Sequence, residues 1–240
     1  MTWIGQIGAG LMLMLTLATQ PPGAGQLVLV KTDGWESVDG VLRRYERGRI
    51  GWNPVGDPVP VVVGRNGMAW GRGLHWREPA RYPAKREGDG KSPAGVYRLN
   101  SAFGYATAKE AKWVKLPYAV AGPTIECVDD AKSAHYNQVL DRSKVAAPDW
   151  SSSEQMRRQD EQYRWGVIVD HNAAPAKAGV GSCIFIHIWE KPGVGTSGCT
   201  AMEAARVEEL LRWLDPKKEP ILVQLPADQY LRLRGKWRLP

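Results

Sequence analysis

The chain has 240 residues, 43% of them hydrophobic, and carries 32 Lys and Arg against 25 Asp and Glu, a formal net charge of +7. This length can bury a large core in one domain, the 11 Trp, 8 Tyr and 2 Phe exclude a mainly disordered protein, and three cysteines are too few for a disulfide-stapled miniprotein. The basic residues are scattered among acidic ones, which favours a solvated basic surface over a nucleic-acid site and would also suit an anionic cell-wall polymer.

The amino-terminal part of the chain has no charged side chain before Lys31, and residues 7–18 are apolar. At about 1.5 Å per residue this stretch is shorter than the roughly 30 Å hydrocarbon core of a bilayer. Its length is typical of the apolar region of a signal peptide, so we expect residues 1–24 to direct export, with cleavage near Ala24. A misassigned start codon and a buried strand are the alternatives, because a basic segment is missing. Residues 25–240 are then expected to form one domain.

Short segments rich in β-branched and aromatic residues follow, and Gly, Pro and Asn separate them. The predicted strands are residues 26–30, 40–45, 59–63, 95–99, 165–169, 183–189 and 221–225. Such a series predicts a mainly β protein, built as a β-sandwich or a mixed sheet.

Helical patterns are fewer. Residues 151–163 are polar and lie between two predicted strands, so we expect a surface helix there. Residues 200–214 are the clearer case, because apolar residues recur at the spacing of one helical face. These are Val207, Leu210, Leu211 and Leu214. Thr200 and Glu203 fit a capping box, so the helix is expected to start directly after Cys199.

The segment around Cys199 carries the pattern of a reactive site. On a strand over residues 183–189, alternation places Ile184, Ile186 and Ile188 on one face. The other face then carries Cys183, Phe185, His187 and Trp189. The Gly- and Pro-rich residues 190–198 can turn the chain, which would bring Cys199 back beside His187.

Such a Cys and His pair can perform acyl transfer. A helix N-terminus and an imidazole would both lower the pKa of the Cys199 thiol, and His187 could transfer the proton. Gly198 would let backbone N–H groups face an oxyanion. A buried structural cysteine is the alternative. Cys183 and His187 would lie about 13 Å apart along a strand, so we expect no metal site, and no cofactor is implied.

Two motifs resemble the catalytic domain of the L,D-transpeptidase (YkuD-type) family. Thr196-Ser197-Gly198-Cys199 is similar to the family's [S/T]-H-G-C nucleophile motif, with His187 at the position of its upstream histidine. REGDGKSPAGVY, residues 86–97, is similar to the family's G-D-x-x-T-P-x-G segment. The resemblance covers about residues 60–225 and is closer to a divergent branch of proteobacterial members, because Ser197 replaces the motif's histidine.

This resemblance implies a peptidoglycan L,D-transpeptidase in cell-wall cross-linking or remodelling. Cys199 would form a thioester with a stem tetrapeptide, releasing D-Ala, and transfer the acyl group to an amine of a second stem peptide. His187 would act as general acid and base, with Gly198 as an oxyanion donor. Thr196, Ser197, Trp189 and Asn172 are the residues expected to bind substrate. The alternatives are an L,D-carboxypeptidase or amidase on the same site, and a non-catalytic wall-binding domain.

The resemblance also implies a compartment and partners. We expect a periplasmic monomer whose partners are peptidoglycan stem peptides and an anionic wall polymer, with no nucleic acid. In an oxidising periplasm Cys127 and Cys183 could form a disulfide and leave Cys199 free. Two buried free thiols are the alternative.

Overall fold

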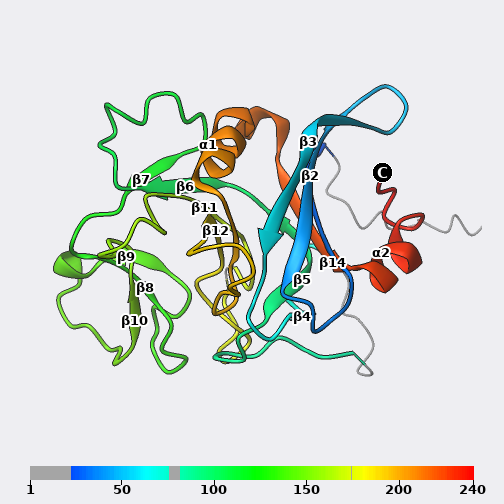
Figure 1. The fold of residues 1–240 in the computed structure, drawn as a ribbon. Coiled ribbons are helices and arrows are strands. Elements are labelled where there is room, and N and C mark those ends of the chain that lie inside the picture. Colours follow the sequence, from blue (N-terminus) through cyan, green and yellow to red (C-terminus); the bar gives the residue numbers. More distant parts are fainter. Residues whose placement is uncertain (1–22, 76–81, 174) are drawn as a thin grey trace, which may run out of the picture.

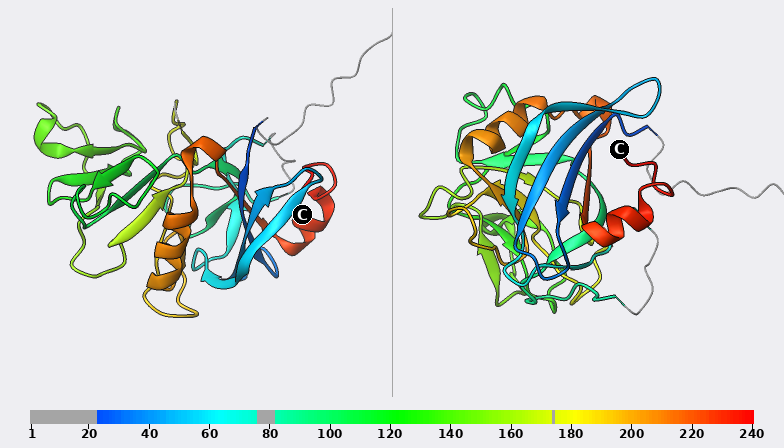
Figure 2. Two further views of the ribbon diagram at one scale, coloured as in Figure 1. Left: turned by 90° about the horizontal axis from the view of Figure 1, so that it is seen from above. Right: turned by 45° about the vertical axis from the view of Figure 1, so that its right-hand side comes forward.

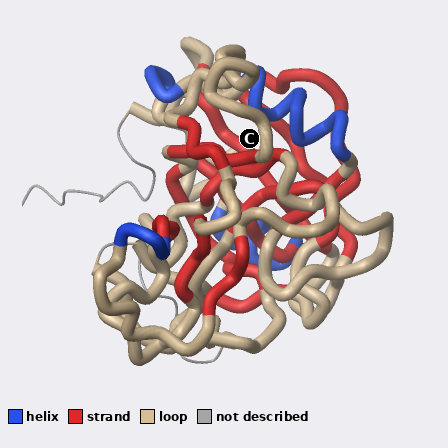
Figure 3. Tube along the Cα trace, turned by 90° about the vertical axis from the view of Figure 1, so that its left-hand side faces the viewer, coloured by secondary structure: helices blue, strands red, loops and turns tan. Residues whose placement is uncertain are grey.

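The computed structural model describes residues 23–75, 82–173 and 175–240, which form a mainly β structure with two α-helices (Figures 1 and 3). The expected signal peptide lies almost entirely outside these residues. Among the described residues no helix is both long enough and apolar enough to cross a membrane.

One mixed sheet of 11 strands dominates the structure. In sheet order its strands are β4 (Met68–Trp70), β5 (Ser92–Arg98), β14 (Ile221–Pro226), β1 (Gln26–Thr32), β2 (Asp39–Arg47), β3 (Trp52–Val62), β13 (Thr200–Met202), β12 (Phe185–Ile188), β11 (Trp165–Ile168), β6 (Ser101–Gly104) and β7 (Tyr118–Val120). The predicted mainly β, mixed-sheet architecture is confirmed.

The short strand β13 joins the two halves of this sheet. It pairs in parallel with β12, and it meets β3 through the single register pair Ala201 and Val62. Most of β3 therefore pairs only with β2, in the long hairpin visible in Figure 1. Pro54, Pro58 and Pro60 lie on this open edge, where a residue without an N–H group cannot support pairing with another strand.

The main hydrophobic core draws on both halves of the sheet and on both helices. Helix α1 (Ala204–Trp213) buries Val207, Leu210 and Leu211, and α2 (Ala227–Leu233) packs on β14 and β1. The helical spacing predicted for residues 200–214 is thus confirmed, whereas the predicted start is not. Thr200 belongs to β13, where its hydroxyl donates to Gln224, and Glu203 is the N-cap residue.

A second, smaller sheet lies at the far end of the molecule from β1–β3 (Figure 2). Its strands, in order, are β10 (Ser153–Gln155), β8 (Ile125–Val128) and β9 (Val139–Asp141). The surface helix predicted over residues 151–163 is wrong, because this segment pairs with β8 as β10 and then turns. That segment has no apolar helical face of its own, so pairing with a distant strand decides its conformation.

A disulfide links the small sheet to the large one. Cys127 on β8 is bonded to Cys183, just before β12, with 5.9 Å between their Cα atoms. Cys199 is the free cysteine. This is the pairing expected from the sequence. Cys183 has a φ of 54°, in the left-handed region that residues other than glycine seldom adopt.

We predict that replacing both cysteines, Cys127→Ala with Cys183→Ala, lowers the free energy of unfolding by about 2–5 kcal/mol, because the bond closes a long loop in the unfolded chain. Urea unfolding followed by Trp fluorescence measures the change, and reduced wild-type protein should match the variant. An unfolding midpoint equal to that of the oxidised wild type would contradict the pairing.

Candidate active site

The candidate nucleophile and base meet because β12 alternates as predicted. Ile184, Ile186 and Ile188 lie in the main core, and Phe185 belongs to a second apolar cluster on the opposite face of the sheet. His187 shares that face, because its ring packs against Tyr163 of the same cluster. The parallel pairing of β12 with β13 then brings Cys199 next to Phe185, whose backbone N–H donates to the sulfur at 3.3 Å.

Cys199 and His187 line one cavity of about 570 Å³ between the two sheets. Many of the residues around it are charged. Its ionisable wall consists of Arg65, Lys85, Glu87, Asp129, Glu154, Arg158 and Glu190. Thr196 and Ser197, which were expected to bind substrate, and Gly198, which was expected as an oxyanion donor, line it as well.

The two sequence motifs meet at the backbone of Cys199. The buried Ser92 hydroxyl, from the upstream motif, donates to the carbonyl oxygen of Cys199 at 2.9 Å. The Thr196 hydroxyl donates to the same oxygen at 2.6 Å. The Gly64 N–H in turn donates to Ser92 Oγ at 2.8 Å, which fixes that hydroxyl. The carbonyl oxygen of Cys199 therefore connects the two motifs through hydrogen bonds.

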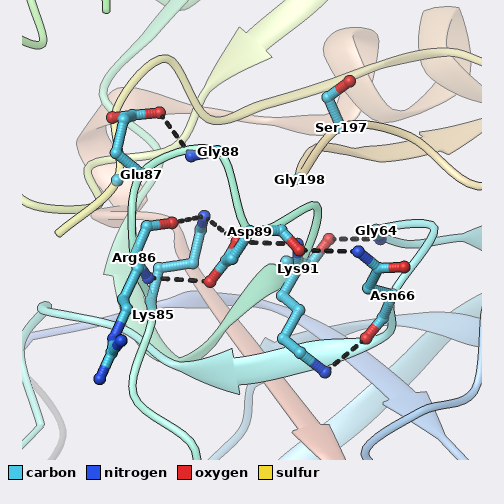
Figure 4. A network of polar contacts seen from close by, with 12 residues as sticks. Gly64, Asn66, Lys85, Arg86, Glu87, Gly88, Asp89, Lys91, Ser197 and Gly198 are labelled. Atoms are coloured by element: carbon cyan, nitrogen blue, oxygen red, sulfur yellow. Dashed lines mark hydrogen bonds and ion pairs between the residues drawn. The ribbon is translucent and has the colours of Figure 1, made fainter. Parts of the chain in front are cut away.

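Asp89 organises the upstream motif. Its carboxylate accepts hydrogen bonds from Lys85 Nζ at 2.5 Å, from the Arg86 N–H at 2.8 Å and from the Lys91 N–H at 2.9 Å. Figure 4 shows the resulting turn of residues 86–91 beside Ser197 and Gly198. The G-D-G part of the motif thus supports the turn that carries Cys199, and its Asp89 holds the buried Lys85 at the cavity.

Gly198, which precedes Cys199, allows the turn of residues 86–91 to lie close to the backbone beside Cys199. Gly198 has a φ of 150°, and a Cβ there would lie 3.1 Å from the Lys91 carbonyl oxygen. Its N–H, expected to face an oxyanion, donates to Thr196 Oγ1 at 3.0 Å. The N–H of Cys199 donates to no described residue and is the better candidate for an oxyanion donor.

Burial keeps the Cys199 side chain as a neutral thiol. The residue is 7% exposed, and desolvation raises its pKa to about 12. The thiol donates to the Cys183 carbonyl oxygen at 3.5 Å. The expectation that a helix N-terminus lowers this pKa is wrong, because β13 separates Cys199 from α1, which begins at Ala204.

His187 is neutral for the same reason. Burial lowers its pKa to about 4, although the Ile188 carbonyl opposes the shift. The ring nitrogen Nδ1 lies 2.8 Å from that carbonyl oxygen, and a carbonyl can only accept. Nδ1 therefore carries the proton, which leaves Nε2 with the lone pair needed by a base.

Tyr163 and Glu154 complete the site and were not identified from the sequence. The Tyr163 ring contacts the His187 ring at 5.0 Å, edge to face. Its hydroxyl donates to Glu154 Oε1. No local pattern marks either residue, because Tyr163 lies in a turn and Glu154 lies on a strand that was predicted as a helix.

Two of the expected substrate residues lie elsewhere. Trp189 does not line the cavity, and its backbone N–H pairs with Met202. Asn172 is fully buried beside a separate cavity of about 730 Å³, where its amide donates to Lys177 and Gly181 carbonyls. Asn172 therefore stabilises the loop that runs from it to Gly181. Among the described residues no group of three or more His, Cys, Asp or Glu is arranged to hold a metal ion.

A family model of the L,D-transpeptidase catalytic domain, YkuD, matches residues 41–223. The matched region covers most of the chain and contains both motifs as well as Tyr163 and Glu154. No curated protein and no solved structure matches the chain significantly.

The raised thiol pKa predicts slow, pH-dependent alkylation. Between pH 7 and 10 the rate of Cys199 modification by iodoacetamide should rise about tenfold per pH unit, because the thiolate remains a minor species below a pKa of about 12. Mass spectrometry of the intact protein measures the rate, and Cys199→Ala controls for other sites. A plateau below pH 9 would show that the thiol is acidic instead.

Proposed function

The chain belongs to the L,D-transpeptidase catalytic domain family (YkuD), and we propose that it cross-links peptidoglycan stem peptides through a thioester on Cys199. The single observation that supports this most is the shared cavity of Cys199 and His187, with both groups buried and neutral. A neutral thiol and a neutral imidazole can exchange a proton during attack without a stable ion pair.

In the first half-reaction the sulfur of Cys199 attacks the carbonyl carbon that precedes D-Ala in a stem tetrapeptide. The thiol proton passes to Nε2 of His187 as the carbon–sulfur bond forms. The carbon–nitrogen bond then breaks, and the same proton moves to the departing amine, which leaves as D-Ala. The product is a thioester with the proton balance closed.

The oxyanion formed during attack needs a backbone donor. The N–H of Cys199 meets this need, since it has no described partner and Ser92 and Thr196 hold its peptide in place. The N–H of Gly198 could contribute only after the Thr196 hydroxyl rotates away. We therefore assign the Cys199 N–H as the first donor.

In the second half-reaction an amine of another stem peptide attacks the thioester and releases Cys199. The cavity supports a cationic acceptor, because Glu87, Asp129 and Glu154 all line it. Of the basic residues at the same cavity, Lys85 is paired with Asp89, Arg158 with Asp160 and more distantly with Glu154, and Arg65 donates to the Ser197 hydroxyl. Among the described residues Glu87 and Asp129 form no ion pair, which supports attraction of an amine in its ammonium form.

We further propose that the protein acts as a monomer in the periplasm. The disulfide supports an oxidising compartment, and the apolar residues 7–18 support export. The net charge of +7 suits contact with an anionic wall polymer and is too scattered in the sequence to favour a nucleic acid.

Purified protein incubated with a disaccharide-tetrapeptide should produce a cross-linked dimer, detected by mass spectrometry. Cys199→Ala should abolish the reaction, and His187→Asn should slow it by about 10²-fold or more, because the proton loses its carrier. Circular dichroism controls for folding of both variants.

Two other outcomes would contradict transpeptidation. Loss of D-Ala without dimer would identify a hydrolase that uses water as acceptor. No reaction, together with no covalent adduct at Cys199 after carbapenem treatment, would favour a non-catalytic wall-binding domain.

A further inference from the structure

In the proposed function, on which this inference rests, the second half-reaction leaves one proton without an acceptor. An ammonium group that becomes an amide nitrogen loses two protons. One returns to the Cys199 sulfur through His187, which reverses the path of the first half-reaction. The other must go to a second base, and the imidazole cannot take both.

Glu154 is placed to be that base. It lines the cavity of Cys199 and His187, and its side chain is 29% exposed, so a bound amine can reach it. Its Oε1 accepts the Tyr163 hydroxyl and lies 3.9 Å from Arg158 Nη1. Its Oε2 has no hydrogen-bond or ion-pair partner among the described residues. One carboxylate oxygen is therefore held, and the other is open to the cavity's ligand.

The neighbouring carboxylates are less suited to this role. Glu87 Oε2 already accepts the hydroxyls of Tyr136 and Ser182, and Glu87 Oε1 accepts the Gly88 N–H. Among the described residues one buried oxygen of Asp129 has no hydrogen-bond partner, but no hydrogen bond joins Asp129 to Tyr163, whose ring contacts His187. Burial, with a smaller contribution from the charges of Asp129 and Glu87, raises the pKa of Glu154 and so makes it a stronger base.

We propose that Glu154 is the general base that deprotonates the acceptor ammonium, with Tyr163 as its positioning residue. The ammonium gives one proton to Glu154 Oε2, and the resulting amine attacks the thioester carbon. As the carbon–nitrogen bond forms, His187 takes the second proton from nitrogen. The carbon–sulfur bond then breaks, and His187 returns that proton to the sulfur. Glu154 finally releases its proton to solvent.

The test separates the two half-reactions in Glu154→Gln. Glutamine keeps an oxygen for the Tyr163 hydroxyl but cannot take a proton. The rate of acyl-enzyme formation, measured in a single turnover as release of D-Ala, should stay within about threefold of the wild-type rate. Transfer to an amino-acid amide should fall at least about tenfold at neutral pH. Transfer should recover with hydroxylamine, which is already uncharged at that pH, and also as the pH is raised.

Three variants serve as comparisons. Glu161→Gln changes an exposed carboxylate of the same segment and should leave both steps unchanged. Glu154→Asp retains a carboxylate and should keep part of the transfer. Tyr163→Phe keeps the ring against His187 and should reduce transfer to charged amines more than to hydroxylamine.

Equal loss with charged amines and hydroxylamine would overturn the role of Glu154, because it would indicate a structural defect. Unchanged transfer in Glu154→Gln would overturn it as well, and so would an equal loss of acylation. Failure of the wild type to form an acyl-enzyme would instead overturn the proposed function.

Discussion

The site depends on how one carbonyl oxygen is held. The hydroxyls of Ser92 and Thr196 converge on the carbonyl of Cys199, and they come from segments more than 100 residues apart. This fixes the turn so that the thiol enters the apolar cluster between the sheets and the Cys199 N–H stays unpaired. The same peptide leads into β13, the strand that joins the two halves of the large sheet. The same contacts therefore position both Cys199 and the strand that joins the sheet.

Burial decides the charge state of the two proposed catalytic side chains. The pKa of Cys199 is raised to about 12 and that of His187 is lowered to about 4. Both shifts favour the uncharged form of each group, so the two side chains rest as thiol and imidazole. In the proposed reaction the proton therefore moves during attack on substrate.

Local pattern predicted the parts of this structure that local interactions determine. Strand alternation placed Phe185 and the isoleucines of β12 correctly, and helical spacing identified the buried face of α1. The start predicted for α1 was wrong because Thr200 pairs with β12, and a capping pattern in the sequence does not reveal such a pairing. Glu154, Tyr163 and Ser92 were missed for a related reason. Their roles depend on packing between segments that are distant in the sequence, and the residues next to them in the sequence do not indicate this packing.

The most direct test of this account is to locate the covalent intermediate. The protein is mixed with a disaccharide-tetrapeptide without an acceptor amine, quenched in acid within one turnover, and digested for peptide mapping by mass spectrometry. We expect the acyl group, lacking D-Ala, on the peptide that contains Cys199, and no adduct in Cys199→Ala. An adduct on another residue, or product formed by Cys199→Ala at the wild-type rate, would contradict it.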